Sequence, residues 1–417
     1  MSKIGKWLKK QPKRRLLFWA LVVVFGLWMY RRYNSMKTPS ARVGTGSLEN
    51  RVFDPNRVYK MIMLTDTSLW EQRYNVIAAN GFDTVQLVVP YSETYNGNFD
   101  FYTKLANYAA SLGLNIVLKT WIRISNPMLY SEFSDSDLAK NQSGTALNNS
   151  GFTLSFNSPK WSKVYDWMRK VKTAFQPLQD AGYIVAHFPS TNETQEFGYS
   201  LENQGDWSQA ETNGSGGLNQ TRGIAYMNYQ ANQLREKLHT IANIFAGWRN
   251  GFDAGSFYYD FHKWAGSYNF EFIADHPEIW FVKNNPLNDG TVRFNGALCY
   301  DWKRRKGKYF SAEYTNSPDS TTAQTLAENH TQMILDGCNL LSFAFHSPDA
   351  NGSGSAFQKA IEVKNILTSN GLWNSNVKTP TKSGEFVYTL QELFDNGHTA
   401  VLNSFNTNPQ RAVRIAS

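Results

Sequence analysis

Cysteine is scarce in this chain, and the common metal and cofactor motifs are missing. Only Cys299 and Cys338 occur among 417 residues, which excludes a disulfide scaffold and a cysteine-rich zinc site. The two thiols could form one bridge in an oxidising compartment or stay buried and free. There is no His-x-His or His-Glu-x-x-His motif, and no Gly-x-Gly-x-x-Gly follows the first predicted strand. We therefore expect no metal site and no cofactor.

A basic field over the globular part of the chain is also absent, although the net charge is +8. Residues 1–42 carry 11 Lys and Arg and no Asp or Glu, whereas the rest of the chain has 31 basic against 34 acidic residues. The positive charge therefore belongs to the N-terminus alone. This distribution excludes nucleic acid as a partner of the globular part.

One uncharged apolar run, residues 16–30, lies between clusters of basic residues. It is shorter than the roughly 20 residues that cross a bilayer, so it is either a signal-anchor with snorkelling basic flanks or the core of a cleaved signal peptide. Pro39-Ser40-Ala41 is only a partial cleavage pattern, which favours the anchor. More basic residues precede the run than follow it. We therefore predict a single transmembrane helix, a cytoplasmic N-terminus and a periplasmic or extracellular domain.

The composition divides the chain into four parts. Residues 1–30 are the basic cytoplasmic segment with its signal-anchor, and residues 31–50 are a polar linker rich in Gly, Ser and Thr. Residues 51–371 alternate apolar runs with helical patterns and form one predicted domain. Residues 372–417 are a C-terminal tail, which we expect to pack on that domain.

Eight apolar runs in residues 51–371 predict strands that are separated by helices. Their content of Val, Ile, Leu and Phe, with little alternation, is typical of parallel strands that helices cover on both sides. The predicted strands are 60–64, 84–90, 115–121, 183–189, 254–261, 279–282, 308–312 and 339–345. The main helices are predicted over 69–80, 101–112, 160–179, 223–246, 321–335 and 356–367. The expected fold is an α/β (β/α)8 TIM barrel, and a doubly wound sheet is the alternative.

Polar and aromatic residues stand where these strands end. In a (β/α)8 barrel the active site lies at the carboxyl ends of the strands, so such positions predict a site. Carboxyl, amide and aromatic groups are suited to binding sugars. The flat amphipathic rings of aromatic residues stack on sugar rings. The candidate substrate-binding residues are Asp66, Tyr91, Trp121, Asn192, Gln195, Tyr259, Asn284, Tyr314 and His346.

Glutamates at two strand ends carry the predicted chemistry. Glu193 and Glu196 follow the fourth strand, and Glu313 follows the seventh. A retaining glycosidase uses two carboxyl groups that lie about 5 Å apart on either side of a sugar ring. An acid between apolar residues at a strand end is costly to bury without a task, which favours a functional role for Glu313.

These motifs resemble those of the clan A glycoside hydrolases, whose acid/base ends strand four and whose nucleophile ends strand seven. Asn192-Glu193 matches the clan's Asn-Glu pair, and residues 195–198 (QEFG) are similar to the Asn-Glu-Tyr-Gly form of the family 42 β-galactosidase-like branch, with Gln in place of Asn. Residues 333–346 are similar to the eighth unit of that branch, although its Gln-Trp-Arg ending is absent. The resemblance implies that Glu313 is the nucleophile. It leaves the acid/base open between Glu196, which we prefer, and Glu193.

The leading hypothesis is a membrane-anchored retaining glycosidase that cleaves an oligo- or polysaccharide. The alternative is a non-catalytic barrel that binds glycan in an envelope or exopolysaccharide assembly. The expected partners are a carbohydrate and, through the N-terminal helix, the membrane. The sequence does not determine the oligomeric state, the sugar or the linkage.

Overall fold

The computed structural model of this chain divides into two compact units, residues 1–46 and 47–417. The residues that it describes all belong to the second unit. They are 49–64, 68–125, 132–140, 144–146, 151–191, 233, 236–254, 272–275, 309–314, 322–335, 337–343, 346–349, 351–378, 385–386 and 412–413. The predicted signal-anchor and almost all of the linker lie outside these ranges. Within them, no helix has the length and apolar character that a membrane span needs.

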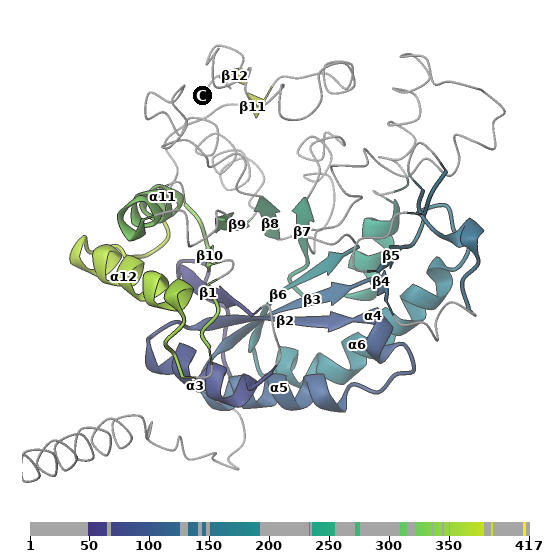
Figure 1. The fold of residues 1–417 in the computed structure, drawn as a ribbon, viewed down its shortest axis with the longest axis horizontal. Coiled ribbons are helices and arrows are strands. Elements are labelled where there is room, and N and C mark those ends of the chain that lie inside the picture. The colour runs from purple at the N-terminus through teal and green to yellow at the C-terminus, as the bar shows by residue number, and fades with distance from the viewer. Residues whose placement is uncertain are drawn as a thin grey trace, which may run out of the picture. The chain divides into compact units, whose positions relative to one another are not determined.

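Eight parallel strands form one sheet (Figure 1). They are β1 (Tyr59–Met63), β2 (Thr84–Pro90), β3 (Asn115–Trp121), β6 (Ile184–Ser190), β7 (Gly251–Ala254), β8 (Phe272–Asp275), β9 (Tyr309–Tyr314) and β10 (Leu340–Phe343). Each strand pairs with the next along the chain, except that β6 and β7 are the two ends of the sheet, and β10 pairs with β1. This order is that of a (β/α)8 barrel opened between β6 and β7.

A backbone bridge joins β6 to the residues that lead into β7. His187 and Asn250 form a parallel bridge, and the backbone N–H of His187 donates to the carbonyl of Arg249 over 2.9 Å. When the register is followed from Pro90 of β2 through the other seven strands, it returns beside β2 at Phe82, eight residues earlier. A stagger of eight residues over eight strands is the geometry of a (β/α)8 barrel.

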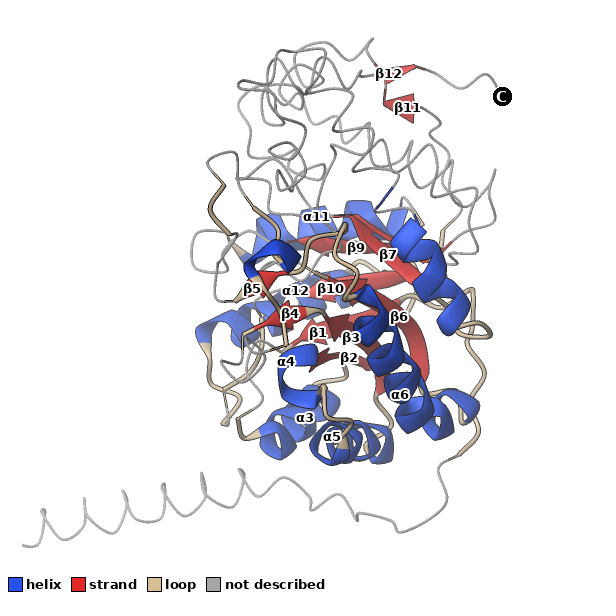
Figure 2. Ribbon diagram, turned by 90° about the vertical axis from the view of Figure 1, so that its right-hand side faces the viewer, coloured by secondary structure: helices blue, strands red, loops and turns tan. Residues whose placement is uncertain are grey.

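Helices cover the outside of the strands (Figures 1 and 2). They are α3 (Trp70–Ala79), the short α4 (Tyr91–Thr94), α5 (Asp100–Ser111), α6 (Trp161–Asp180), α11 (Ala323–Leu335) and α12 (Ser355–Ser369). Residues 236–244 are also helical. Helices α3 and α5 are followed by Gly81 and Gly113, whose φ angles of 75° and 77° permit the left-handed turn that ends a helix.

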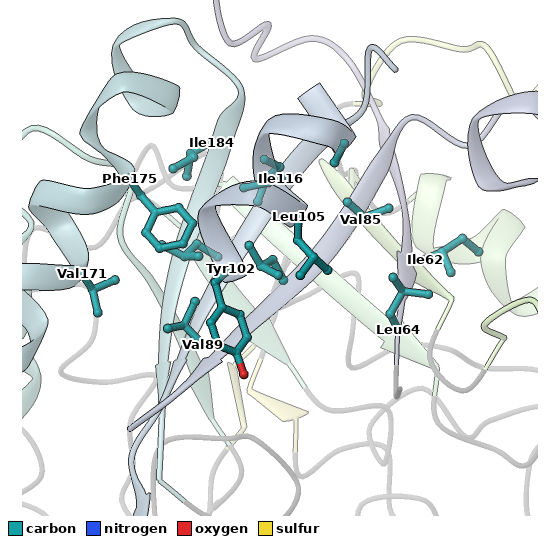
Figure 3. Close-up of a cluster of buried hydrophobic side chains, with 14 of the residues drawn as sticks. Ile62, Leu64, Val85, Val89, Tyr102, Leu105, Ile116, Val171, Phe175 and Ile184 are labelled. Atoms are coloured by element: carbon teal, nitrogen blue, oxygen red, sulfur yellow. The ribbon is translucent and has the colours of Figure 1, made fainter. Parts of the chain in front are cut away.

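The main hydrophobic core lies between the strands and these helices (Figure 3). Val85, Leu87 and Val89 of β2 belong to it, as do Leu105 of α5 and Phe175 of α6. Since side chains alternate across a strand, the other residues of β2 face the interior of the barrel. Burial on both faces explains why the strand sequences show so little alternation.

A second, smaller cluster fills the barrel interior. Its members are Tyr59, Met61, Val117, Val185, Ala186, Phe188 and Leu340. Gly251 of β7 adds room to this cluster, because a Cβ atom at that position would lie 2.0 Å from the ring of Phe188. The interior is therefore packed, as expected for this fold.

The predicted positions of strands five and six need correction. Ala254–Phe261 was expected as strand five, but the fifth place in the sheet is taken by Gly251–Ala254. The sixth place is taken by Phe272–Asp275, and the predicted strand over 279–282 lies outside the described residues. The predicted runs begin at the last residue of β7 and four residues after the end of β8, so hydrophobicity alone placed both strands too late.

Smaller elements extend the domain. The long segment after β3 contains β4 (Arg123–Ile124), the 3-10 turn η2 (Asp135–Asp137) and β5 (Phe152–Thr153), of which β4 and β5 pair antiparallel. After α12, Trp373 packs edge-on against Phe82, and strands β11 (Glu385–Phe386) and β12 (Ala412–Val413) pair with each other. Cys338 is buried and its thiol donates to the Leu340 carbonyl over 2.9 Å, whereas Cys299 lies outside the described residues.

Candidate active site at the carboxyl ends of the strands

The interior of the barrel is closed at the level of β2 residue Gln86 and more accessible above it. Gln86, Val117 and Ser342 are buried at inward positions, with exposed fractions of 3%, 1% and 0%. Closer to the carboxyl ends, Val88 and Trp121 are only partly buried. These two inward side chains are therefore more accessible than those below them, at the end of the barrel where a (β/α)8 fold carries its site.

Glu313 stands on β9 one residue before its end, in register with Ser342 of β10. The sequence had placed it just after the strand, whereas β9 continues through Tyr314. Glu313 shares a strand face with Tyr309, which packs on the inner cluster, so it occupies an inward position. Tyr314, predicted to bind substrate, pairs with Phe343 and belongs to the opposite face.

Three charged residues share one layer of the interior. Because the stagger shifts the register by one residue per strand, each interior layer takes its four residues from alternate strands. At the height of Glu313, the register gives Met63 of β1, Lys119 of β3 and Asp253 of β7. The layer below contains Gln86, Phe188, Ala274 and Ser342 and has no charge. The charged layer is therefore the floor of the open end.

Trp121 ends β3 at an inward position two residues after Lys119. Its ring is partly buried, and the guanidinium of Arg123 lies 5.1 Å from the ring centroid. Arg123 is 2% exposed and donates to the Gly151 carbonyl over 2.6 Å, which ties the strand end to the loop beside β5. A ring held this way at the barrel mouth is a suitable platform for a sugar.

Tyr91 has different surroundings from those expected of a substrate-binding residue. It begins α4, is 3% exposed, and packs edge-on against Trp167 of α6 with ring centroids 5.2 Å apart. Burial raises the pKa of its phenol to about 12. The ring belongs to the main core, and its contact with substrate stays a prediction.

His346 follows β10 and is fully buried. Its ring lies edge-on to Phe343, a residue of the main core, with centroids 6.0 Å apart. Burial, with a smaller contribution from the nearby His346 ring, lowers the pKa of His330 of α11 to about 4. His346 therefore lies on the helix side of β10, and its predicted contact with substrate also stays a prediction.

The other predicted site residues lie outside the described residues. They are Asp66, Asn192, Glu193, Gln195, Glu196, Tyr259 and Asn284. Among the described residues, Glu313 and Trp121 hold inward register positions near the carboxyl ends of β9 and β3. The predictions for the other seven residues remain untested.

Sequence reasoning missed Lys119 and Asp253 as site residues. Lys119 could have been noticed, because a lysine between the apolar residues 116–118 and 121–122 is unusual in a buried strand. Asp253 was missed because strand five was predicted to start at Ala254, one residue after it.

No protein-family model matches the chain, and no curated protein matches it in sequence. Solved structures do match. A β-galactosidase from Rahnella sp. R3 is similar with a TM-score of 0.58 and 12% identity over 84% of this chain. A family 42 β-galactosidase from G. stearothermophilus has a TM-score of 0.56 and 11% identity over 84% of this chain. The catalytic domain of a β-amylase from Paenibacillus polymyxa has a TM-score of 0.51 and 13% identity over 75% of this chain.

The expected resemblance to clan A glycoside hydrolases is confirmed, since family 42 is among the structures found. At such low identity the likeness shows the fold alone. The chain spans 60% of the Rahnella enzyme, 62% of the G. stearothermophilus enzyme and 99% of the β-amylase domain.

Proposed function

We propose that this protein is a retaining glycoside hydrolase that cleaves a glycosidic bond in an oligo- or polysaccharide. The observation that supports this most is the register of β9, in which Glu313 has an inward position at the level where the interior opens. A carboxylate at the carboxyl end of the seventh strand is where an enzyme of this clan has its nucleophile. The similar solved glycosidases support the same choice of fold.

The proposed reaction has two steps. Glu313 attacks the anomeric carbon, the bond to the leaving oxygen breaks, and the acid/base gives its proton to that oxygen. Water then attacks the glycosyl-enzyme, the acid/base takes a proton from the water, and Glu313 is released as a carboxylate. Glu196 is the proposed acid/base, with Glu193 as the other candidate. Trp121 is the proposed platform for a sugar ring.

Hydrolysis of a panel of aryl β-glycosides by the full-length protein in detergent tests this proposal. We expect release of the phenol by the wild type and a loss on the order of 10³-fold or more in Glu313→Gln, because a neutral amide cannot form the glycosyl-enzyme. Glu362→Gln, at an exposed position of α12, is the matched control and should keep full activity. An active Glu313→Gln variant would contradict the assignment.

A second candidate is a barrel that binds glycan without cleaving it. The observation that favours it is Gln195, which stands where the family 42 pattern has Asn. A protein that releases no phenol from any glycoside, and yet binds oligosaccharides with and without the Glu313→Gln change, would have this function.

We also propose that residues 16–30 anchor the protein in a membrane, with the barrel on the periplasmic or extracellular side. The apolar run and the excess of basic residues before it support this topology. The anchor predicts that the protein resists extraction by alkaline carbonate and that its intact mass includes residues 1–41. A mature protein that lacks those residues would instead have had a cleaved signal peptide.

A further inference from the structure

A cavity lies at the amino ends of β1 and β2, at the opposite end of the strands from the position of Glu313. Its volume is about 280 Å³. The wall comes from the chain around the start of β1 (Asp54, Arg57 and Lys60), from the turn before β2 (Gly81 and Asp83) and from residues 373–376 after α12. The cavity is therefore separate from the candidate active site.

Backbone contacts hold the walls of this cavity together. Arg57 and Asn376 form an antiparallel bridge, and the backbone N–H of Val377 donates to the Asn56 carbonyl over 2.7 Å. These contacts join the segment before β1 to the segment after α12. The cavity is therefore formed by the fold itself, as is usual for a small-molecule site.

Lys60 is a buried lysine in this wall, with an exposed fraction of 6%. Its Nζ atom lies 3.8 Å from Oδ2 of Asp83, which is too far for a hydrogen bond. The same atom lies 5.6 Å from the ring centroid of Trp373, a contact that compensates charge but supplies no oxygen acceptor. Burial lowers the pKa of Lys60, as expected for an ammonium whose charge is only partly compensated.

Asp83 is already engaged by other donors. Its Oδ1 atom accepts from the backbone N–H of Lys60 over 2.7 Å and from the hydroxyl of Thr84 over 2.9 Å. Its Oδ2 atom accepts from the guanidinium of Arg57 over 2.8 Å. An ammonium carries three N–H donors, and those of Lys60 are left for a ligand in the cavity.

The other groups of the wall that lack a partner are also donors. The Oγ atom of Ser375 is buried and has no hydrogen-bond partner among the described residues. Arg57 uses one nitrogen for Asp83, and a guanidinium has five N–H donors. Asp54, the second acid of the wall, is exposed, so water screens its charge. The cavity therefore lacks an acceptor, and a negatively charged one fits it best.

We propose that this cavity binds a small oxyanion, a phosphate or carboxylate group, through the Lys60 ammonium, the Ser375 hydroxyl and the Arg57 guanidinium. An oxyanion accepts several charge-assisted hydrogen bonds at once, and these are stronger than bonds between neutral groups. It would compensate the buried charge of Lys60 and satisfy the hydroxyl of Ser375. The site does not depend on the proposed hydrolase function.

Calorimetric titration of the full-length protein in detergent tests this proposal, with sodium phosphate, sodium acetate and glycerol as separate probes. We expect one molecule of phosphate or acetate to bind per chain, and the better of the two identifies the group. Lys60→Met should weaken this binding by about tenfold or more, because it removes a charge-assisted hydrogen bond. Lys170→Met, at an exposed position of α6, is the matched control and should bind as the wild type does.

Three results would overturn the proposal. They are the lack of saturable binding of either anion, an unchanged affinity in Lys60→Met, and tighter binding of glycerol than of both anions. The last result would mean that the cavity takes an uncharged polyol.

Ser375→Ala provides a second test that does not depend on the folding of Lys60→Met. It removes one hydroxyl from a half-buried residue that follows α12, so we expect the Tm to stay near that of the wild type. The affinity for the anion should fall by about threefold to tenfold, because one hydrogen bond to a charged ligand is lost. An unchanged affinity in a folded Ser375→Ala variant would also overturn the site.

Discussion

The Nδ1 atom of His187 lies 3.2 Å from the Oδ1 atom of Asn250, and this contact joins the two end strands of the sheet. The amide nitrogen of Asn250 donates to the Phe245 carbonyl over 3.0 Å, so its oxygen is the acceptor for His187. Nδ1 therefore carries the proton, and Nε2 accepts from the hydroxyl of Thr120 at 3.0 Å. A neutral histidine with both nitrogens satisfied closes the barrel.

Asn250→Ala should destabilise the protein by about 2–3 kcal/mol, because the buried imidazole N–H of His187 loses its acceptor and the Phe245 and Trp248 carbonyls lose the amide that donates to them. Denaturant unfolding of the purified protein measures this loss. Asn107→Ala is a suitable control, since Asn107 is exposed on α5 and bonds only to the backbone of its own helix. Equal losses in the two variants would mean that the β6–β7 contact contributes little.

Stability should fall as the pH drops below 6.5. Burial lowers the pKa of His187 from 6.5 to about 3, so the unfolded chain takes up a proton in this window that the native protein does not. Stability therefore rises with pH between about 3 and 6.5, by roughly 3 kcal/mol from pH 4 upwards. His187→Gln should reduce the slope of unfolding free energy against pH. His330, whose pKa is about 4, should account for part of the remaining slope. An unchanged slope in His187→Gln would contradict this prediction.

Gly251→Ala should cost about 1–3 kcal/mol, because the new Cβ would lie 2.0 Å from a ring carbon of Phe188. The penalty comes from crowding of the inner cluster. Phe188→Leu in the same chain should therefore recover part of the loss. Unfolding curves of the single and double variants measure these losses of stability. A double variant that loses more than the sum of the two single losses would refute the steric explanation.

Much of this fold is readable from the sequence. Strands β2 and β3 were predicted with their observed bounds, because their unbroken Val, Ile and Leu content reflects burial on both sides. Helices α3, α5 and α6 were predicted within one residue, since Gly81, Gly113 and Gly182 mark where they end.

The errors have physical causes. β7 and β8 are four residues long, too short to show a pattern, and the more apolar runs that follow them in the sequence were predicted as strands instead. The charged layer could not be predicted from the sequence either, because it depends on the register of all eight strands rather than on any local motif. The shared height of Lys119, Asp253 and Glu313 can be recognised only when the stagger of the strands is known.

The choice between Glu196 and Glu193 is open to a leaving-group experiment. A variant without its acid/base should hydrolyse aryl glycosides of acidic phenols much faster than those of poor leaving groups, because only the latter need protonation. We expect this dependence in Glu196→Gln and not in Glu193→Gln. Rates over a series of substituted phenols measure it, and the reverse result would move the acid/base to Glu193.

Labelling with a 2-deoxy-2-fluoro glycosyl inactivator tests the central claim most directly. Such a sugar forms the glycosyl-enzyme but is hydrolysed from it very slowly, so the intermediate accumulates. We predict that intact mass rises by one fluorosugar and that peptide mapping places the sugar on Glu313, with no labelling in Glu313→Gln. A sugar attached to another residue, or turnover of a good substrate with no labelling at all, would contradict Glu313 as the nucleophile.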